Sequence, residues 1–234
     1  MGAIFLLIVG IAAGAIAAVF IVSLVVSMVR SRRANQVLAE RRRSRNFAYE
    51  LLCAGLGGRY VLKNLRIPCG VRPDGRKAYA NVPLVLINRG GVSIIDVRNE
   101  VGHIDNPLRG EWTLTYGNEQ QTFRNPFEAN AQKGRVVEHL LKKENLYNVP
   151  ISNIVLYTQP GVKFRNGRYQ NLLTADRIVP YMLDLGKNRF MTLHEMEKTL
   201  KMLSAFRVKG APARRGAPAP AAAARQNAQP GANN

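Results

Sequence analysis

The stretch that decides the fold is ANVPLVLINRGGVSIIDVRNEVGHIDNP, residues 80–107. It contains two apolar runs, Val82–Ile87 and Val92–Val97, on either side of a turn at Asn88–Gly91. Valine, isoleucine and leucine at this density, interrupted by asparagine and glycine, predict a β-hairpin. We therefore expect two neighbouring antiparallel strands around which the rest of the chain is organised.

Polar side chains gather at one end of the predicted hairpin. Because side chains alternate between the two faces of a strand, Asp96 and Arg98 share a face with the apolar Val92 and Ile94. Folding about the turn brings Asn81 roughly opposite Arg98. These polar residues are the first candidates for a functional site, and an ordinary salt bridge between Asp96 and Arg98 at a strand end is the alternative.

The charge balance indicates an anionic partner. The chain has 34 Lys and Arg against 15 Asp and Glu, a formal net charge of +19 and a pI near 10.7. Such a balance favours nucleic acid or acidic lipid. Part of the excess lies in the arginine-rich segment 30–46 and part in the tail, so the middle of the chain keeps a moderate surplus that a solvated surface also explains.

Cysteine and histidine usage argues against a structural zinc site. Cys53 and Cys69 form no CxxC pair, and the histidines do not stand at metal-ligand spacing from them. We expect reduced thiols, because the topology derived next places the domain in the cytoplasm.

The N-terminal segment predicts a membrane anchor. Gly2–Val29 contains no charged residue, and as a helix it would be roughly 40 Å long, enough to cross a ~30 Å hydrocarbon core. A cleaved signal peptide would need a basic region in front of the apolar core, which is missing here. The sequence therefore predicts a transmembrane helix over residues 3–29, with the N-terminus outside and the rest of the chain in the cytoplasm.

A basic neck over residues 30–46 follows the predicted anchor. We interpret its arginines as a topology signal lying on anionic lipid headgroups, with nucleic-acid contact as the alternative. The neck is expected to continue as a helix to Leu52 and to end near Gly55. Within the anchor, Gly10 and Gly14 form a GxxxG pattern that would let two spans dimerise.

The folded domain is predicted over residues 47–207, and an Ala/Pro-rich tail over 208–234 is expected to be disordered. A turn is expected at Pro73–Gly75. Helices are expected over Phe127–Glu144 and, after a capping box at Thr192–Glu195, over Met196–Phe206, with Leu193, Met196, Leu200 and Leu203 on one face. Extended segments are expected at Arg59–Ile67, Gly110–Tyr116, Gln121–Phe123 and Ile151–Thr158, and one more short extended piece is expected within Leu172–Val179.

Several segments in this order resemble one family. They are Glu50, Gly58–Asn64, Asn81–Val85, Gly91–Asn99 and Gly102–Ile104, followed by Trp112, Asn125-Pro126 and the segment Ile151–Thr158. Together they resemble the nuclease-related domain, NERD, over most of the chain from Phe47 to about Phe206. The family is similar to the PD-(D/E)xK nuclease fold and is often found in membrane-tethered bacterial proteins.

The resemblance implies an α/β domain of the restriction-endonuclease type. The expected fold class is a mixed β-sheet flanked by helices, preceded by one N-terminal transmembrane helix. The implied activity is phosphodiester cleavage at a Mg²⁺ site on the hairpin, where carboxylates hold the metal and the metal activates a water.

The site residues implied by the resemblance depart from the family pattern. Glu50 matches the helix glutamate, whereas Asn81 stands where the family has aspartate, and Asp96 where it has glutamate. Arg98 stands at the family's lysine, and Ala129 at a glutamine. An asparagine contributes no charge to a metal site, and an arginine stays protonated, so it cannot act as a base.

Three functions remain open from the sequence. The first is a membrane-tethered domain with a degenerate site that binds nucleic acid or another anion, with Arg98, Lys133 and Arg135 as contacts. The second is a protein–protein scaffold that keeps a nuclease-like fold. The third is an active nuclease with an altered site, in which Glu50 and Asp96 hold the metal and Arg98 stabilises developing charge.

Overall fold

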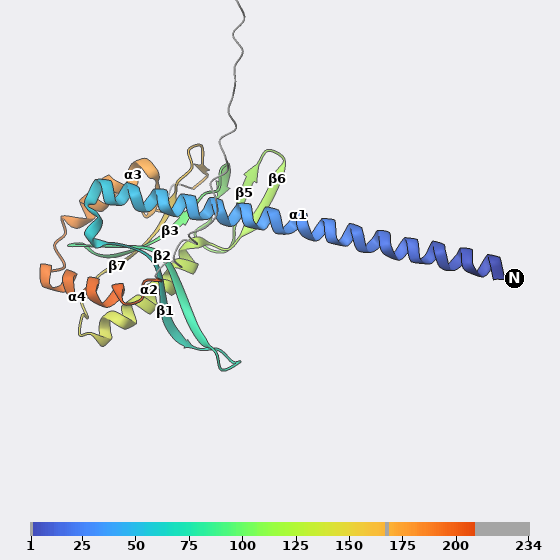
Figure 1. The fold of residues 1–234 in the computed structure, drawn as a ribbon. Coiled ribbons are helices and arrows are strands. Elements are labelled where there is room, and N and C mark those ends of the chain that lie inside the picture. The colour runs from blue at the N-terminus through green and yellow to red at the C-terminus, as the bar shows by residue number, and fades with distance from the viewer. Residues whose placement is uncertain (1, 167–168, 209–234) are drawn as a thin grey trace, which may run out of the picture.

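The computed structural model describes residues 2–166 and 169–208 (Figure 1). Within this part, the side chains of 2–22, 24–25, 29–30 and 33–34 are not described. The tail predicted to be disordered lies, from residue 209 onward, outside the described residues.

Helix α1 (Gly2–Leu56) is one continuous helix whose N-terminal half projects away from the domain (Figure 1). The prediction that the basic neck continues as a helix to near Gly55 is confirmed. The predicted anchor at 3–29 lies mostly among residues whose side chains are not described, and so does the predicted dimer contact at Gly10 and Gly14. Among the residues that could be searched, no helix is both long enough and apolar enough to cross a membrane.

The main sheet has five strands, and the predicted hairpin lies within it. The strand order is β1-β2-β3-β7-β9, in which β1, β2 and β3 are antiparallel and β3, β7 and β9 are parallel. The hairpin register pairs Asn88 with Gly91, as the turn predicted. The strand bounds are β1 Val61–Val71, β2 Lys77–Asn88, β3 Gly91–Arg98, β7 Ile151–Tyr157 and β9 Leu172–Thr174.

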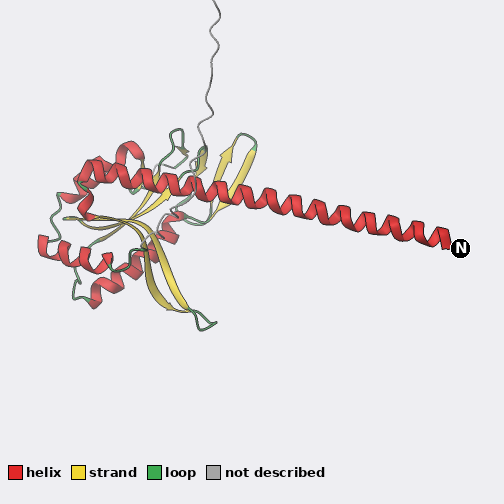
Figure 2. Ribbon diagram, in the orientation of Figure 1, coloured by secondary structure: helices red, strands yellow, loops and turns green. Residues whose placement is uncertain are grey.

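Helices cover both faces of this sheet (Figure 2). Helices α2 (Pro126–Lys143) and α4 (Leu193–Ser204) pack on one face, where the core includes Val92 and Ile94 of β3. The C-terminal part of α1 and helix α3 (Ala175–Gly186) pack on the other, against side chains that include Ile95. The predicted mixed sheet flanked by helices is therefore confirmed.

A second, smaller sheet has the strand order β6-β5-β4-β8. It packs through Trp112, which is fully buried, against Ile104 and Tyr157. The predicted strand ending at Tyr116 and its hairpin partner are confirmed. The bounds are β4 His103–Asp105, β5 Trp112–Tyr116, β6 Glu119–Phe123 and β8 Lys163–Phe164, and a single 3-10 turn, Gly58–Tyr60, precedes β1.

The structure adds to or differs from the predictions in two places in the C-terminal third. The short extended piece expected within 172–179 is confirmed as β9, but helix α3, which begins at Ala175, was not predicted. The helix forms because Ile178 and Met182, four residues apart, are both buried against the sheet. In α4 the capping box is confirmed, but Leu193 at the first helical position is exposed, because the buried face runs through Met196, Thr199 and Leu203.

The turn between β2 and β3 depends on a close backbone approach. Gly91 has a φ of +127°, and a Cβ built on it would lie 2.3 Å from the carbonyl oxygen of Pro150. The amide of Val92 donates a hydrogen bond to that same oxygen, at 2.9 Å. Glycine at this position therefore lets the start of β3 lie directly against the segment that leads into β7.

We expect Gly91→Ala to lower the free energy of unfolding by about 3 kcal/mol, because it combines a strained φ with a backbone clash. Gly75→Ala is the matched control, since its φ is also positive, at +76°, but nothing lies within 4 Å of a Cβ there. The control should cost about 1 kcal/mol. Urea unfolding followed by the fluorescence of Trp112, the single tryptophan, measures both. Equal losses in the two variants would show that the Pro150 contact does not matter.

Candidate anion-binding site

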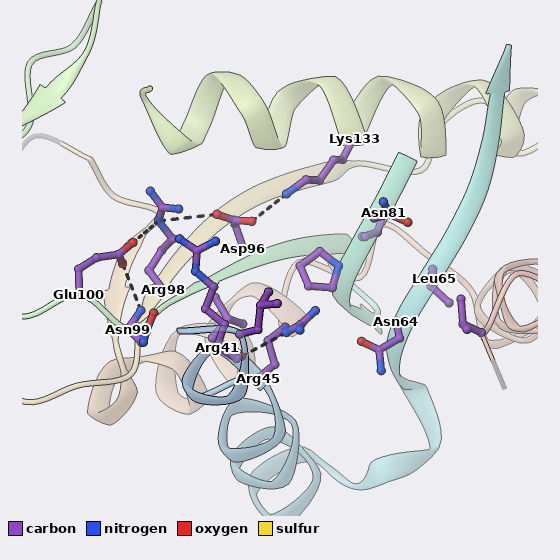
Figure 3. A pocket seen from close by; sticks show the side chains of 15 residues that line it. Arg41, Arg45, Asn64, Leu65, Asn81, Asp96, Arg98, Asn99, Glu100 and Lys133 are labelled. Carbon is purple, nitrogen blue, oxygen red and sulfur yellow. Dashed lines mark hydrogen bonds and ion pairs between the residues drawn. The ribbon is translucent and has the colours of Figure 1, made fainter. Parts of the chain in front are cut away.

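The polar end of the hairpin opens into a cavity of about 420 Å³ (Figure 3). Strands β2 and β3 form its floor, and side chains of α1, α2 and β1 reach it from the sides. Figure 3 places Asn64 and Asn81 at one end of the cavity, and Asn99 and Glu100 at the other. Its polar lining side chains are Arg41, Arg45, Asn64, Asn81, Asp96, Arg98, Asn99, Glu100 and Lys133.

Asp96 is held by cations on two sides. Lys133 Nζ donates a hydrogen bond to Asp96 Oδ1 at 2.7 Å, and Arg98 Nε lies 4.0 Å from Asp96 Oδ2. Glu100 also lies near Arg98, with 3.7 Å between its Oε1 and Arg98 Nε. The Asp96 and Lys133 side chains are only 17% and 20% exposed, so water screens this pair less than it would a surface pair.

Helix α2 places Lys133 over Asp96. The helix is held in this position by the buried side-chain amide of Asn130, one turn before Lys133. Asn130 Nδ2 donates to the carbonyl oxygens of Ile94 on β3 and Ile154 on β7, at 2.8 and 3.1 Å. At Gly134 a Cβ would lie 2.8 Å from the Asn153 side chain, so the helix approaches β7 closely. These contacts fix both the height and the rotation of α2 above the strands.

Arg98 combines burial with two carboxylate neighbours. Burial by itself lowers the pKa of its guanidinium, but Glu100 and Asp96 outweigh that effect and raise the pKa above its ordinary value. The guanidinium also lies over the ring of Phe123, 5.0 Å from its centroid. Its Nε is buried and makes no hydrogen bond to any residue that the structure describes. Arg98 therefore remains a fixed cation under all physiological conditions.

Helix α1 adds two arginines that the sequence analysis assigned to lipid headgroups. Arg41 and Arg45, one turn apart, both line the cavity, and Arg45 Nε donates to the Arg41 carbonyl oxygen at 3.2 Å. Burial and the neighbouring Arg42 and Arg41 lower the pKa of Arg45, while Asp96 opposes them. The sequence did contain a signal for this placement. Arg41 and Arg45 are four residues apart and Ala48, which is buried, follows one turn later, so the three side chains lie on the same side of the helix.

Four of the residues predicted from the sequence line one cavity: Asn81, Asp96, Arg98 and Lys133. Arg135 does not, because it is exposed two residues farther along α2, about 200° around the helix from Lys133, and lines a separate hollow. Ala129, at the family's glutamine position, does not line the cavity either.

Glu50 also lies outside the cavity, with an exposed side chain on α1. The buried stripe of this helix runs through Ser44, Ala48 and Leu52. At about 100° per residue, Glu50 points about 200° away from Ala48, toward solvent. The structure therefore does not bring Glu50 and Asp96 together as the predicted pair of metal ligands.

The cavity suits an anion better than a divalent cation. It has four cationic side chains against two carboxylates, and both carboxylates are already paired with cations. In the part of the chain that is described, no three His, Cys, Asp or Glu side chains gather to hold a metal ion. The donor set thus does not fit Mg²⁺, whereas guanidinium and ammonium groups match the geometry and charge of phosphate oxygens.

Comparison with known proteins gives one family match. The model of the nuclease-related domain (NERD) matches residues 39–158, which include β1, β2, β3, α2, β7 and the cavity arginines Arg41 and Arg45 of α1. No curated protein and no solved structure gives a significant match.

We expect Asp96→Asn to lower the free energy of unfolding by about 1–3 kcal/mol, because it leaves Lys133 and Arg98 without their shared counter-charge. Asp105→Asn is the control: its pair with Arg165 is about half exposed or more and should contribute less than about 0.5 kcal/mol. Urea unfolding of both variants at neutral pH tests this. A loss no larger than that of the control would show that the Asp96 pair does not stabilise the fold.

Proposed function

The chain belongs to the nuclease-related domain family, and on that premise we propose that it is a membrane-anchored member that binds nucleic acid. In this proposal the anchor is the segment 3–29 and the domain lies at the cytoplasmic face. The catalytic site is degenerate, and the cavity holds phosphate groups without a metal ion. The domain is of the restriction-endonuclease-like type, as three antiparallel strands followed by parallel ones suggest.

The single observation that supports this proposal best is the pairing of Asp96 with Lys133. A nuclease of this kind needs its strand carboxylate free to hold a cation. Here an ammonium group lies 2.7 Å from that carboxylate and supplies the positive charge from within the chain. Together with Arg98, Arg41 and Arg45, it leaves the cavity with a surplus of positive charge for an anionic ligand.

The long helix supports the membrane part of the proposal. Gly2–Val29 carries no charge, and the arginine-rich neck follows within the same helix α1. Because Arg41 and Arg45 lie in that helix and line the cavity, the segment proposed as the anchor and the cavity share one continuous helix. The tether would hold the cavity close to the cytoplasmic surface, where the arginines before Arg41 can contact headgroups.

We expect the full chain in neutral nanodiscs to bind a labelled 20-mer oligonucleotide in EDTA, with an affinity that falls steeply as salt is raised. The double variant Arg41→Gln, Arg45→Gln should bind at least about tenfold more weakly, because two phosphate contacts are lost. Fluorescence anisotropy from 50 to 300 mM salt measures both.

The matched control for this experiment is Arg109→Gln with Arg177→Gln, two exposed arginines outside the cavity. It removes the same charge and should keep wild-type affinity within about twofold. If the wild-type chain did not bind at low salt, the nucleic-acid function would be wrong, and the scaffold interpretation would take its place.

We expect no Mg²⁺- or Mn²⁺-dependent cleavage by the wild-type chain, because Lys133 and Arg98 compete with a metal for Asp96. Asn81→Asp combined with Arg98→Lys restores the family's aspartate and lysine and should raise Mg²⁺ affinity, measured by isothermal titration. Wild-type cleavage that Asp96→Ala abolishes would show an active nuclease and overturn the degenerate site. Cleavage that persists in Asp96→Ala would be contamination.

A further inference from the structure

The distal halves of β1 and β2 form an arm that projects beyond the helices (Figure 1). We define the arm as residues 66–81, in which Arg66 pairs with Asn81 at the base and Val71 pairs with Lys77 near the tip. Every residue from Pro68 to Lys77 is exposed. This part of the ribbon therefore contributes little to the core, and its side chains are free to meet another molecule.

Positive charge is concentrated on this arm. A hollow of about 610 Å³ along it is lined by Arg66, Arg72, Arg76, Lys77, Tyr79 and Asn81. Asp74 is the single acidic residue in the arm, and it lies 3.9 Å from Arg76 in a pair that is at least half exposed. An exposed pair of this kind neutralises little, so the hollow keeps a surplus of positive charge.

The arm has a defined shape, which a binding surface requires. At its tip the amide of Gly75 donates to the Arg72 carbonyl oxygen at 2.9 Å, and the amide of Arg72 donates to the Arg76 carbonyl oxygen at 2.8 Å. The predicted turn at Pro73–Gly75 is thus a closed, hydrogen-bonded turn. The guanidinium of Arg66 lies over the ring of Tyr79, 4.2 Å from its centroid, and so is held in place near the base.

The arm hollow continues into the anion-binding cavity. Asn81 lines both of them, as the last residue of the arm and part of the cavity wall. From Arg66 to Arg72 an extended strand covers up to about 20 Å. That length matches about six phosphates of a nucleic-acid strand at about 3.4 Å of axial rise each.

We propose that the concave face of the β1–β2 arm is a second binding surface for the phosphodiester backbone of nucleic acid. Resting on the proposed function, this inference extends it: a strand held at the cavity by Arg41 and Arg98 runs along the arm past Arg66 to Arg72 and Lys77. A hollow lined with cations along its length fits a convex polyanion. A planar lipid surface would reach mainly the tip.

The test is the triple variant Arg72→Gln, Arg76→Gln, Lys77→Gln, made in the full chain in neutral nanodiscs. All three side chains are exposed, so the fold is expected to remain intact. The probe is the 20-mer oligonucleotide titrated over a range of salt. Each phosphate contact contributes about one unit to the slope of log K against log salt, so the slope should fall by about 2 to 3.

The matched control removes three exposed charges elsewhere, through Arg109→Gln, Arg177→Gln and Lys201→Gln. It should leave the salt slope within about half a unit of wild type. A shorter probe of six nucleotides should lose less affinity in the arm variant than the 20-mer does, because it can occupy the cavity alone.

The possible negative results distinguish a wrong inference about the arm from a wrong proposed function. If wild type binds and the arm variant behaves like the control, the arm inference is overturned and the proposed function stands. If wild type does not bind at low salt, both are overturned. If the arm variant loses binding to phosphatidylserine vesicles but not to the oligonucleotide, the arm is a lipid contact and this inference is wrong.

Discussion

The site depends on how α2 is attached to the seam between two parallel strands. The Asn130 amide donates to backbone oxygens of both β3 and β7, and Gly134 lets the helix approach β7 closely. This attachment sets the rotation of α2 about its axis. The rotation brings Lys133 Nζ to 2.7 Å from Asp96 Oδ1. Without it, the same lysine would be one more solvated charge on a basic surface, and Asp96 would keep only its longer contact with Arg98.

Charge balance inside the cavity then decides which ligands it can take. An ammonium group beside Asp96 and a guanidinium between Asp96 and Glu100 supply locally the positive charge that a nuclease obtains from a metal ion. Because these cations are side chains of the protein and are largely buried from solvent, they are present whether or not a divalent ion is available. The proposal that the cavity holds an anionic ligand without a metal ion rests on these charges.

The long helix α1 links three features that the sequence presents separately. Its first part is the charge-free segment, its middle carries the arginine-rich neck, and its last turns pack Ala48 and Leu52 into the core. Since one helix has a single rotation, the packing of Ala48 and Leu52 also determines that Arg41 and Arg45 face the cavity. The same packing turns Glu50 to solvent, although it matches the family's helix glutamate in sequence.

The sequence by itself determined the strands, the turn and the hairpin register, which depend on residues close together in the chain. The two runs rich in valine, isoleucine and leucine and the Asn88–Gly91 turn predict β2 and β3 in the correct register, which puts Asn81 and Arg98 at the same end. Such features follow from neighbours along the chain, so they can be predicted from periodicity and turn chemistry. Helix α3 was not predicted, because it is stabilised by the burial of Ile178 and Met182 against a sheet that is assembled from distant parts of the chain.

Only the tertiary structure decided which charges meet. Lys133 was named from the sequence as a basic residue on a helix, but its bond to Asp96 joins side chains 37 positions apart. Arg41 belongs to the cavity and Glu50 does not, and both outcomes depend on the rotation of α1 against the sheet. Contacts between separate elements are set by packing in three dimensions, and no single stretch of sequence encodes the angle at which two elements meet.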